Sequence, residues 1–261
     1  MPKFFIDPAA LRAGDGGQRQ VTIGGADAHH LARVLRAKPG DRISVTDGQG
    51  NLYEVELAVV TPETVQGDVL QIGPDQAEPA LKITLFQSIL KGEKMDWVLQ
   101  KGTEIGITAF VPFLSDRTVA RPAPHQFAKK QERWQKIVTA AAKQSGRGLI
   151  PTVHPVTPWS AMPRLLTEHF TLVAWEGETT CSLRQALSQR EQLTAVQLVI
   201  GPEGGFSSEE VEALVHQGAL SVSLGPRILR AETAGPLAAG LLLYHYGALE
   251  PAPSTFPNNG R

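Results

Sequence analysis

The chain has 261 residues, of which 42% are hydrophobic and 20% charged, so it can bury a sizeable core and form more than one domain. Its single cysteine, Cys181, excludes an intrachain disulfide and favours a reduced, cytoplasmic setting. The start, MPKFFIDPAA, lacks the pattern of a signal peptide. The apolar stretch 236–249 is too short and too interrupted by glycine to span a membrane, so we expect a buried helix there.

The net charge of −1 is unevenly distributed. Residues 1–80 carry 7 Lys and Arg against 11 Asp and Glu, residues 81–160 carry 12 against 5, and residues 161–261 carry 6 against 10. A positive block between two acidic blocks favours a polyanionic partner. The alternative is a solvated helix face.

The first 73 residues are typical of a small β-barrel. DRISVTD (41–47) alternates apolar and polar residues, and NLYEVELAVV and TVQGDVLQI follow across the turns DGQGN and TPE. One short helix is expected ahead of these strands, at DAHHLARVLR. The Pro- and Gly-rich stretch GPDQAEPA (73–80) predicts a linker.

After residue 80, strands alternate with helices. LKITLFQSIL, ITAFVPF, TLVAW, AVQLVI and LSVSL are short apolar runs rich in β-branched and aromatic residues. The alternation predicts an α/β domain with a parallel sheet. We expect residues 251–261 to form a disordered tail.

A helix predicted over 126–146 carries much of the positive block. Its apolar face holds Phe127, Trp134, Ile137, Val138, Ala141 and Ala142, and the basic residues on the opposite side are Lys129, Arg133, Lys136, Lys143 and Arg147. This stripe contains no acid, whereas a solvated helix usually mixes signs. A second acid-free cluster consists of His29, His30, Arg33, Arg36 and Lys38. Together they predict contacts with a nucleic acid long enough to touch both.

The stretch LVIGPEGGFSSEEV (198–211) predicts a strand, a glycine turn and a helix start. Ser207 and Glu210 form a capping box at that start. GPEGG matches neither the Walker loop nor the dinucleotide fingerprint, and Glu203 within it disfavours a phosphate. For this loop alone, a tight connection is an adequate alternative.

A second loop, SLGPRILRAETAGPLAAG (223–240), repeats the pattern of strand, glycine turn and helix. The apolar pair Ile228 and Leu229 lies among the polar residues Arg227, Arg230, Glu232 and Thr233. This combination indicates a pocket for a flat heterocycle with a charged appendage.

IGPEGGF followed by SLGPRILRAETA resembles the RsmE family, SPOUT-class methyltransferases that form N3-methyluridine in 16S rRNA. HHLARVLRAKPGD, KGEKMDWVLQKGTEIGI and ERWQKIVTAAAKQSGR resemble other segments of that family, and the matches keep order and spacing from residue 3 to residue 249. Lys3, Gly102 and Ala231 depart from the residues common there. Only Ala231 lies beside the presumed pocket, where it replaces a hydroxyl.

The resemblance implies a PUA-like RNA-binding β-barrel over 1–73 and, over 80–250, a SPOUT-type parallel sheet with a C-terminal trefoil knot. It implies 16S rRNA or the small ribosomal subunit as partner, and a homodimer with the C-terminal helix at its interface. It also implies that the knot's loops bind S-adenosylmethionine. The residues it assigns to this donor are Ala174, Trp175, Glu176, Gly177, Ile200, Gly201, Pro202, Glu203, Gly204, Gly205, Leu224, Gly225, Ile228, Leu229, Arg230 and Thr233.

Methyl transfer to N3 of uridine requires an unpaired or extruded base and loss of the N3 proton. We expect Arg230 to stabilise negative charge on the uracil carbonyls, and Glu203 or Glu232 to be the base. For Glu232 the alternative is a carboxylate favoured by the helix dipole. The sequence has no Cys/His spacing for a metal, so none is expected. Two other functions stay open: a non-enzymatic RNA-binding ribosome-assembly factor, and a SPOUT methyltransferase acting on tRNA.

Overall fold

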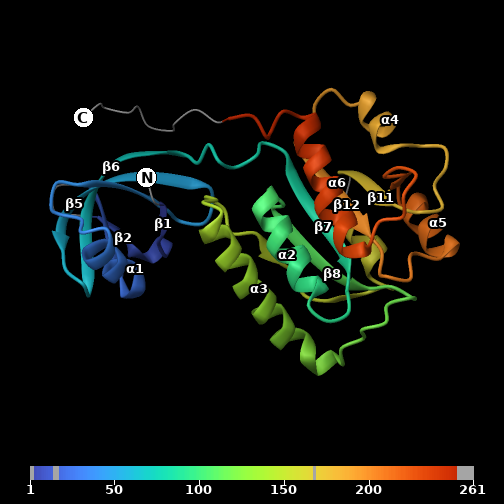
Figure 1. Cartoon of the computed structure of the whole chain (residues 1–261), viewed down its shortest axis with the longest axis horizontal. Coiled ribbons are helices and arrows are strands. Elements are labelled where there is room, and N and C mark those ends of the chain that lie inside the picture. Colours follow the sequence, from blue (N-terminus) through green and yellow to red (C-terminus); the bar gives the residue numbers. More distant parts are fainter. Residues whose placement is uncertain (1–2, 14–17, 167–168, 252–261) are drawn as a thin grey trace. The chain divides into compact units, whose positions relative to one another are not determined.

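The computed structural model describes residues 3–13, 18–166 and 169–251, and it divides the chain into two compact units (Figure 1). The first unit contains the chain up to Glu78 together with Ala142–Ile150. The second contains Pro79–Ala141 and Pro151–Glu250. The predicted domain boundaries did not anticipate the return of 142–150 to the first unit. Residues 252–261 of the predicted tail lie outside the described part of the chain.

The first unit is built on a six-stranded sheet in the order β1-β4-β5-β6-β3-β2. Its strands are β1 (Lys3–Phe5), β2 (Leu11–Ala13), β3 (Arg19–Gly24), β4 (Arg42–Thr46), β5 (Asn51–Val60) and β6 (Thr64–Pro74). The predicted meander is present, because β4, β5 and β6 pair antiparallel in sequence. The helix expected at DAHHLARVLR is a short α-helix, α1 (Gly25–His29), that continues as a π-helical turn, η2 (His30–Val34). Leu31 of this turn is fully buried against the sheet's apolar face.

The boundary between the two units, after Glu78, falls within the stretch 73–80 that was predicted as a linker, and the part up to Glu78 packs on the first unit. β6 extends to Pro74, and Asp75 is 6% exposed. Lys3 forms an ion pair with Asp75, and its Nζ also donates a 2.7 Å hydrogen bond to the carbonyl of Gly146. The carboxylate of Glu78 pairs with Arg147 and accepts hydrogen bonds from the N–H groups of Gly148 and Leu149. Local composition located this boundary, but it did not reveal the contacts that order residues 73–78, which come from residues about 70 positions away.

The second unit contains the predicted parallel sheet, in the order β10-β8-β7-β12-β11-β13, with β9 also pairing with β8. Its strands are β7 (Lys82–Ser88), β8 (Ala109–Leu114), β9 (Thr152–Val153), β10 (Thr157–Pro158), β11 (Phe170–Ala174), β12 (Ala195–Ile200) and β13 (Leu220–Val222). All these pairings are parallel. Each of the five apolar runs predicted as a strand contains one, so the predicted fold class is confirmed.

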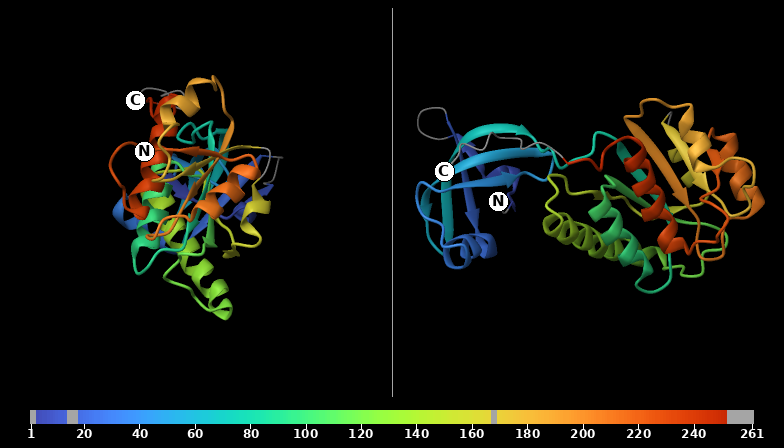
Figure 2. Two further views of the ribbon diagram at one scale, coloured as in Figure 1. Left: turned by 90° about the vertical axis from the view of Figure 1, so that its right-hand side faces the viewer. Right: turned by 45° about the horizontal axis from the view of Figure 1, so that its top comes forward.

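Helices cover both faces of this sheet. They are α2 (Lys94–Ile105), α3 (Phe127–Gln144, whose last three residues group with the first unit), α4 (Leu183–Ser188), α5 (Ser208–His216) and α6 (Ala231–His245). In Figures 1 and 2, α6 (red) runs beside α2 (green). Side chains alternate along the strands: Leu85 lies under Gly235 of α6, whereas Phe86 joins the core beneath α5. None of the helices in the described ranges is long and apolar enough to span a bilayer.

Candidate functional site

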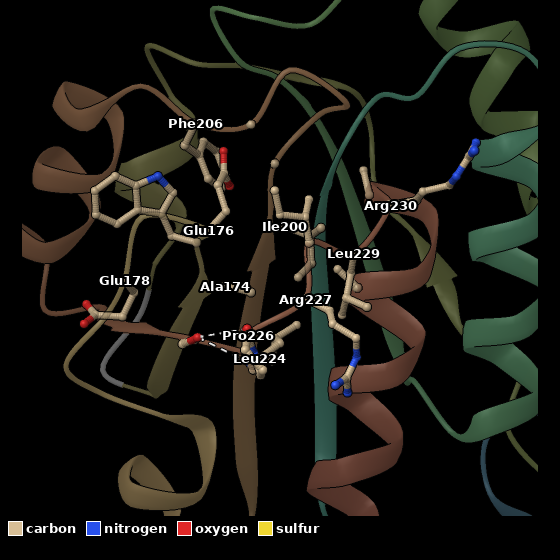
Figure 3. A pocket seen from close by; sticks show the side chains of 18 of the residues that line it. Ala174, Glu176, Glu178, Ile200, Phe206, Leu224, Pro226, Arg227, Leu229 and Arg230 are labelled. Carbon is tan, nitrogen blue, oxygen red and sulfur yellow. Dashed lines mark hydrogen bonds between the residues drawn. The ribbon is translucent and has the colours of Figure 1, made fainter.

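A cavity of about 960 Å³ lies where three neighbouring strands end (Figure 3). β11 pairs with β12 on one side and with β13 on the other, all parallel, so the loops that leave their carboxyl ends converge. These loops, 174–182, 201–206 and 223–230, line the cavity together with the start of α6 and Lys94. The volume is that of a site for a small organic molecule.

Most residues that the resemblance assigned to the donor line this cavity; only Gly177 and Thr233 do not. Phe206, Pro226, Arg227, Ala231 and Glu232, which lie within the loops predicted to bind the donor, also line it. The lining further includes residues outside those predicted loops: Lys94, Glu178, Thr179, Thr180, Cys181, Ser182, Gln185, Ser223 and Ala234. Six of these, from Glu178 to Ser182 and Gln185, lie between β11 and the first turn of α4, which carries no glycine motif. The polar run ETTCS was the one signal available there.

The loop 201–206 packs against the buried ring of Phe206 and the carboxylate of Glu176. The ring of Phe206 is buried, and a Cβ added at Gly201 would approach it to 3.1 Å. Gly205 has a φ of +68°, and a Cβ there would collide with the carboxylate of Glu176. A glycine is therefore required at 205 by backbone conformation and by close approach.

The predicted capping box is confirmed at the start of α5. The Ser207 hydroxyl accepts a 3.2 Å hydrogen bond from the backbone N–H of Glu210, and the Glu210 carboxylate accepts one of 2.9 Å from Ser207 N–H. The other carboxylate oxygen of Glu210, which is buried, accepts from Asp116 N–H at 2.8 Å. Arg117 then donates to the carbonyls of Gly204 and Phe206, at 3.2 and 3.4 Å. The segment after β8 thus braces the glycine loop.

The loop after β11 is organised by Glu178. Its carboxylate accepts hydrogen bonds from the N–H and hydroxyl of Thr180 and from the N–H of Cys181, at 2.6–3.0 Å. These bonds, first of all those from Thr180, lower the pKa of Glu178 from 4.5 to about 2. Ser223 N–H donates to the Cys181 carbonyl at 2.8 Å, which ties this loop to the end of β13. Glu178 is therefore an ionised, structural carboxylate.

The loop after β13 contributes apolar surface and two arginines. In Figure 3, Leu224, Pro226 and Leu229 gather near Ile200 and Ala174, while the side chains of Arg227 and Arg230 extend in opposite directions. Both arginines are exposed, and so is Ile228, at 89%. The cavity thus offers an apolar wall for a flat group, with cationic side chains beside it.

The two carboxylates predicted as candidate bases lie at one lysine. Nζ of Lys94 is 3.2 Å from Oε1 of Glu203 and 3.6 Å from Oε2 of Glu232. Burial raises the pKa of Glu203, but hydrogen bonds from Lys91 N–H, its own N–H and Lys94, with the charge of Lys94, outweigh burial and leave this pKa lowered. At neutral pH, Glu203 is thus an ionised carboxylate with weak basicity.

The predicted RNA-contacting residues divide into two groups. His29, His30, Arg33, Arg36 and Lys38 are exposed on the first unit, and Lys129, Arg133, Lys136 and Lys143 are exposed along α3. Acids from other elements pair with two of the α3 residues, Arg133 with Asp96 and Lys143 with Asp27. The basic stripe of α3 is therefore partly neutralised by acids that the sequence of the helix alone did not reveal.

Arg147 does not belong to that stripe, and its predicted RNA contact is wrong. α3 ends at Gln144, and Arg147 is 4% exposed. Its guanidinium donates to both carboxylate oxygens of Glu78, at 3.3 and 2.7 Å. The prediction extended the helical periodicity beyond Gln144, where α3 ends, and so placed the buried Arg147 on an exposed face.

Sequence comparison supports the same architecture. The chain matches an RNA methyltransferase domain over residues 77–243 and an RNA methyltransferase PUA domain over residues 23–70. It is 32% identical to ribosomal RNA small subunit methyltransferase E of Bacillus subtilis, over 94% of this chain and 96% of the relative. Its identity to the enzyme of the same name from Synechocystis is 36%, over 84% and 71%.

Solved structures resemble it over nearly their whole length. Ribosomal RNA small subunit methyltransferase E from Neisseria gonorrhoeae, bound to S-adenosyl methionine, matches with a TM-score of 0.75 and 32% identity, over 94% of this chain and 98% of that one. A methyltransferase from Legionella pneumophila in complex with the same cofactor matches with a TM-score of 0.73 and 28% identity, over 93% and 97%.

A PUA domain followed by a parallel α/β domain whose strand-end loops enclose a cavity defines a class of RNA methyltransferase. Within that class, the chain belongs to the ribosomal RNA small subunit methyltransferase E family. The family predicted from IGPEGGF and SLGPRILRAETA is confirmed.

Proposed function

We propose that the protein transfers a methyl group from S-adenosylmethionine to N3 of a specific uridine in 16S rRNA of the small ribosomal subunit. The observation that carries this proposal is the cavity of about 960 Å³ formed by the loops after β11, β12 and β13. Relatives matched over most of their length are named as small-subunit rRNA methyltransferases, and solved relatives hold the methyl donor.

The residues present fit this donor. Ala174, Ile200 and Leu229 provide apolar surface of the kind that accommodates a flat adenine. Glu203 and Glu232 provide negative charge for a sulfonium. Oε2 of Glu232 is buried and accepts no hydrogen bond from any described residue, so a cationic ligand would stabilise it.

When bound, S-adenosylmethionine supplies an electrophilic methyl group. The chain must then orient the uracil and stabilise the charge left when N3 loses its proton. Arg230, exposed at the first residue before α6 and lining the cavity, is suited to stabilise negative charge on the uracil carbonyls. Its place at the N-terminus of α6 adds the positive end of the helix dipole.

A calorimetric titration tests the donor site. A valine at Gly201 would press on the Phe206 ring, and both residues line the cavity, so Gly201→Val should distort the loop and lose S-adenosylmethionine binding that the wild type shows. Gly218→Ala, at a glycine outside the cavity lining, is the matched control and should bind normally. No heat for the wild type, or equal affinity for wild type and Gly201→Val, would contradict the donor site.

Mapping modified nucleosides in RNA from cells with and without the protein tests the reaction. The expected result is N3-methyluridine at one 16S rRNA position, present only with the protein. Ribosome assembly defects without any lost methylation would favour the assembly factor, and lost methylation confined to tRNA would favour the tRNA methyltransferase.

A homodimer is part of this proposal. α6 exposes Leu237, Leu241 and Tyr244, at 40, 41 and 73%, and their spacing of four and three residues places them on one stripe. Such a stripe suits a second copy of the same helix. Light scattering at micromolar concentration should give twice the chain mass, and Leu241→Glu should give the monomer. A monomeric wild type would contradict the dimer.

Three further predictions belong to this proposal: a C-terminal trefoil knot, a cytoplasmic location and a reaction that needs no metal ion. Among the described residues, no group of three or more His, Cys, Asp or Glu side chains is arranged to hold a metal ion. Activity that survives dialysis against a strong chelator is the expected result for a metal-free reaction, and restoration by a divalent ion would contradict it.

A further inference from the structure

Lys94 reaches the cavity from a segment that is separate from the three strand-end loops. It is the first residue of α2, directly after the turn that leaves β7. Its ammonium group pairs with Glu203 in the loop after β12 and with Glu232 in the first turn of α6. One cation therefore joins three segments of the second unit that are far apart in sequence.

The two carboxylates are partly buried beside this cation. The Glu203 side chain is 24% exposed and that of Glu232 is 17% exposed, while Lys94 is 35% exposed. Glu203 also accepts from Lys91 N–H at 3.1 Å. The 3.6 Å separation from Lys94 exceeds hydrogen-bonding distance, so among the described residues Oε2 of Glu232 has electrostatic compensation without a hydrogen bond.

Three other charged side chains of the surrounding loops, Arg117, Glu176 and Arg230, are engaged elsewhere or exposed. Arg117 donates to the carbonyls of Gly204 and Phe206, and the carboxylate of Glu176 packs against Gly205. Arg230 precedes α6 and is exposed. Within the described part of the chain, Lys94 is the residue that forms ion pairs with Glu203 and Glu232.

Resting on the proposed function, we propose that Lys94 is a positioning residue that keeps Glu203 and Glu232 ionised together and holds their two loops in register around the methyl donor. One lysine and two carboxylates leave a net charge of −1 at the cavity wall, which complements a donor with one net positive charge. In this arrangement both carboxylates provide charge for the donor, which is an alternative to the general-base role that stays a prediction for them.

Removing the cation should make the pair take up a proton. Two partly buried carboxylates that share a site without compensation cannot both stay ionised easily, so the pKa of one rises. In Lys94→Met that raised pKa makes the folded state relatively most stable at low pH, and stability is lost as pH rises through it. Lys94→Arg keeps the charge, and Lys101→Met, whose lysine pairs with Glu104 at 2.8 Å on the same helix, is the matched control.

Thermal unfolding without ligand tests this directly. The Tm deficit of Lys94→Met relative to wild type should grow by about twofold or more between pH 5 and pH 7.5. The deficits of Lys94→Arg and Lys101→Met should stay constant over that range. Adding Glu203→Gln to Lys94→Met removes one of the two carboxylates and should abolish the pH dependence. If Lys94→Met does not fold, recovery of folding in this double variant supports the proposal and failure to recover overturns it.

Donor binding gives the second readout. Between pH 5 and pH 7, wild-type affinity for S-adenosylmethionine should be nearly constant, whereas that of Lys94→Met should rise by up to about tenfold per pH unit as the extra proton is expelled. Parallel pH profiles for wild type and Lys94→Met in both measurements would overturn the role of Lys94. A wild type that binds no donor would overturn the proposed function instead, and the ligand-free unfolding test would still decide the role of Lys94.

Discussion

The buried pair of Glu78 and Arg147 in the first unit and the cluster of Lys94, Glu203 and Glu232 in the second differ in how completely their charges are satisfied. The side chains of Glu78 and Arg147 are 7 and 5% exposed, one anion faces one cation, and Glu78 also accepts from the N–H groups of Gly148 and Leu149. The second cluster is more exposed, has two anions for one cation and leaves a buried oxygen that accepts no hydrogen bond from the residues the structure describes.

The first pair consists of structural charges, whereas the second cluster carries a charge that is available to a ligand. A buried pair that is balanced and fully hydrogen-bonded gains nothing from a further partner. An unbalanced cluster at a cavity wall has an excess of negative charge, and a cationic ligand can stabilise that charge further. The predictions below test this difference at single residues.

Glu78→Gln should give the largest effect on stability. The change leaves Arg147 charged and buried, which costs about 3–5 kcal/mol in the free energy of unfolding of the first unit. Glu56→Gln, which breaks the exposed 3.6 Å pair with Arg42, is the control and should cost less than about 1 kcal/mol. Urea unfolding at pH 7 measures both, and equal costs would contradict the buried pair's structural role.

The cost of Glu78→Gln should also depend on pH. Burial raises the pKa of Glu78, but hydrogen bonds from Arg147, the charge of Arg147 and the two backbone N–H groups outweigh it, so this pKa lies below the ordinary 4.5. A lowered folded-state pKa stabilises the fold above the unfolded-state pKa and loses that contribution as pH falls through the folded value. The difference between wild type and Glu78→Gln should therefore be full at pH 7 and shrink below about pH 4.5.

Arg230→Ala tests whether an exposed arginine at the cavity contributes to the reaction, in contrast to the buried Arg147, which contributes to stability. Single-turnover methyl transfer should fall about 100-fold or more, as for loss of a donor that stabilises developing negative charge. Stability should change little, because Arg230 is exposed. Arg227→Ala is the matched control, since Arg227 lines the same cavity but extends the other way (Figure 3). Near-normal transfer in Arg230→Ala would remove the arginine from the reaction.

Sequence reasoning succeeded where the signal was local. The five buried strands, the capping box of Ser207 and Glu210 and two of the three cavity loops followed from apolar runs, short spacings and glycine turns. The family resemblance added the third loop, at Ala174, which carries no motif of its own.

It failed where side chains distant in sequence meet. The partners of Arg147 and Glu203 are Glu78 and Lys94, which lie 69 and 109 residues away. A single sequence provides no pairing signal at such distances. Burial of Arg147 also depends on where α3 ends, and Gly146, at a φ of +69°, follows that end within two residues.

Gly205→Ala should have a smaller effect, concentrated at the cavity. The positive φ and the contact with Glu176 together cost about 1–3 kcal/mol, so the loop shifts and donor affinity falls by about tenfold. Gly218→Ala separates the two causes, because Gly218 has a φ of +91°, open space around it and no place in the cavity lining. It should lower Tm without changing donor affinity. A donor affinity for Gly205→Ala equal to wild type would show that the contact with Glu176 does not shape the site.

The smallest effect is expected for RNA binding along α3. Here too, basic side chains that already pair with an acid differ from those that are available to a ligand. Lys129 and Lys136 are exposed, whereas Arg133 and Lys143 already pair with Asp96 and Asp27. If phosphates of rRNA lie along this stripe, each lysine displaces about one counterion. Lys129→Ala/Lys136→Ala should therefore reduce the slope of log affinity against log salt by about 1.4–1.8 units, with donor affinity unchanged. Arg133→Ala should reduce it by less, because that guanidinium must first exchange Asp96 for a phosphate. A filter-binding titration with a 16S rRNA fragment from 50 to 300 mM salt measures both slopes, and an unchanged slope in the double variant would make the stripe a solvated helix face.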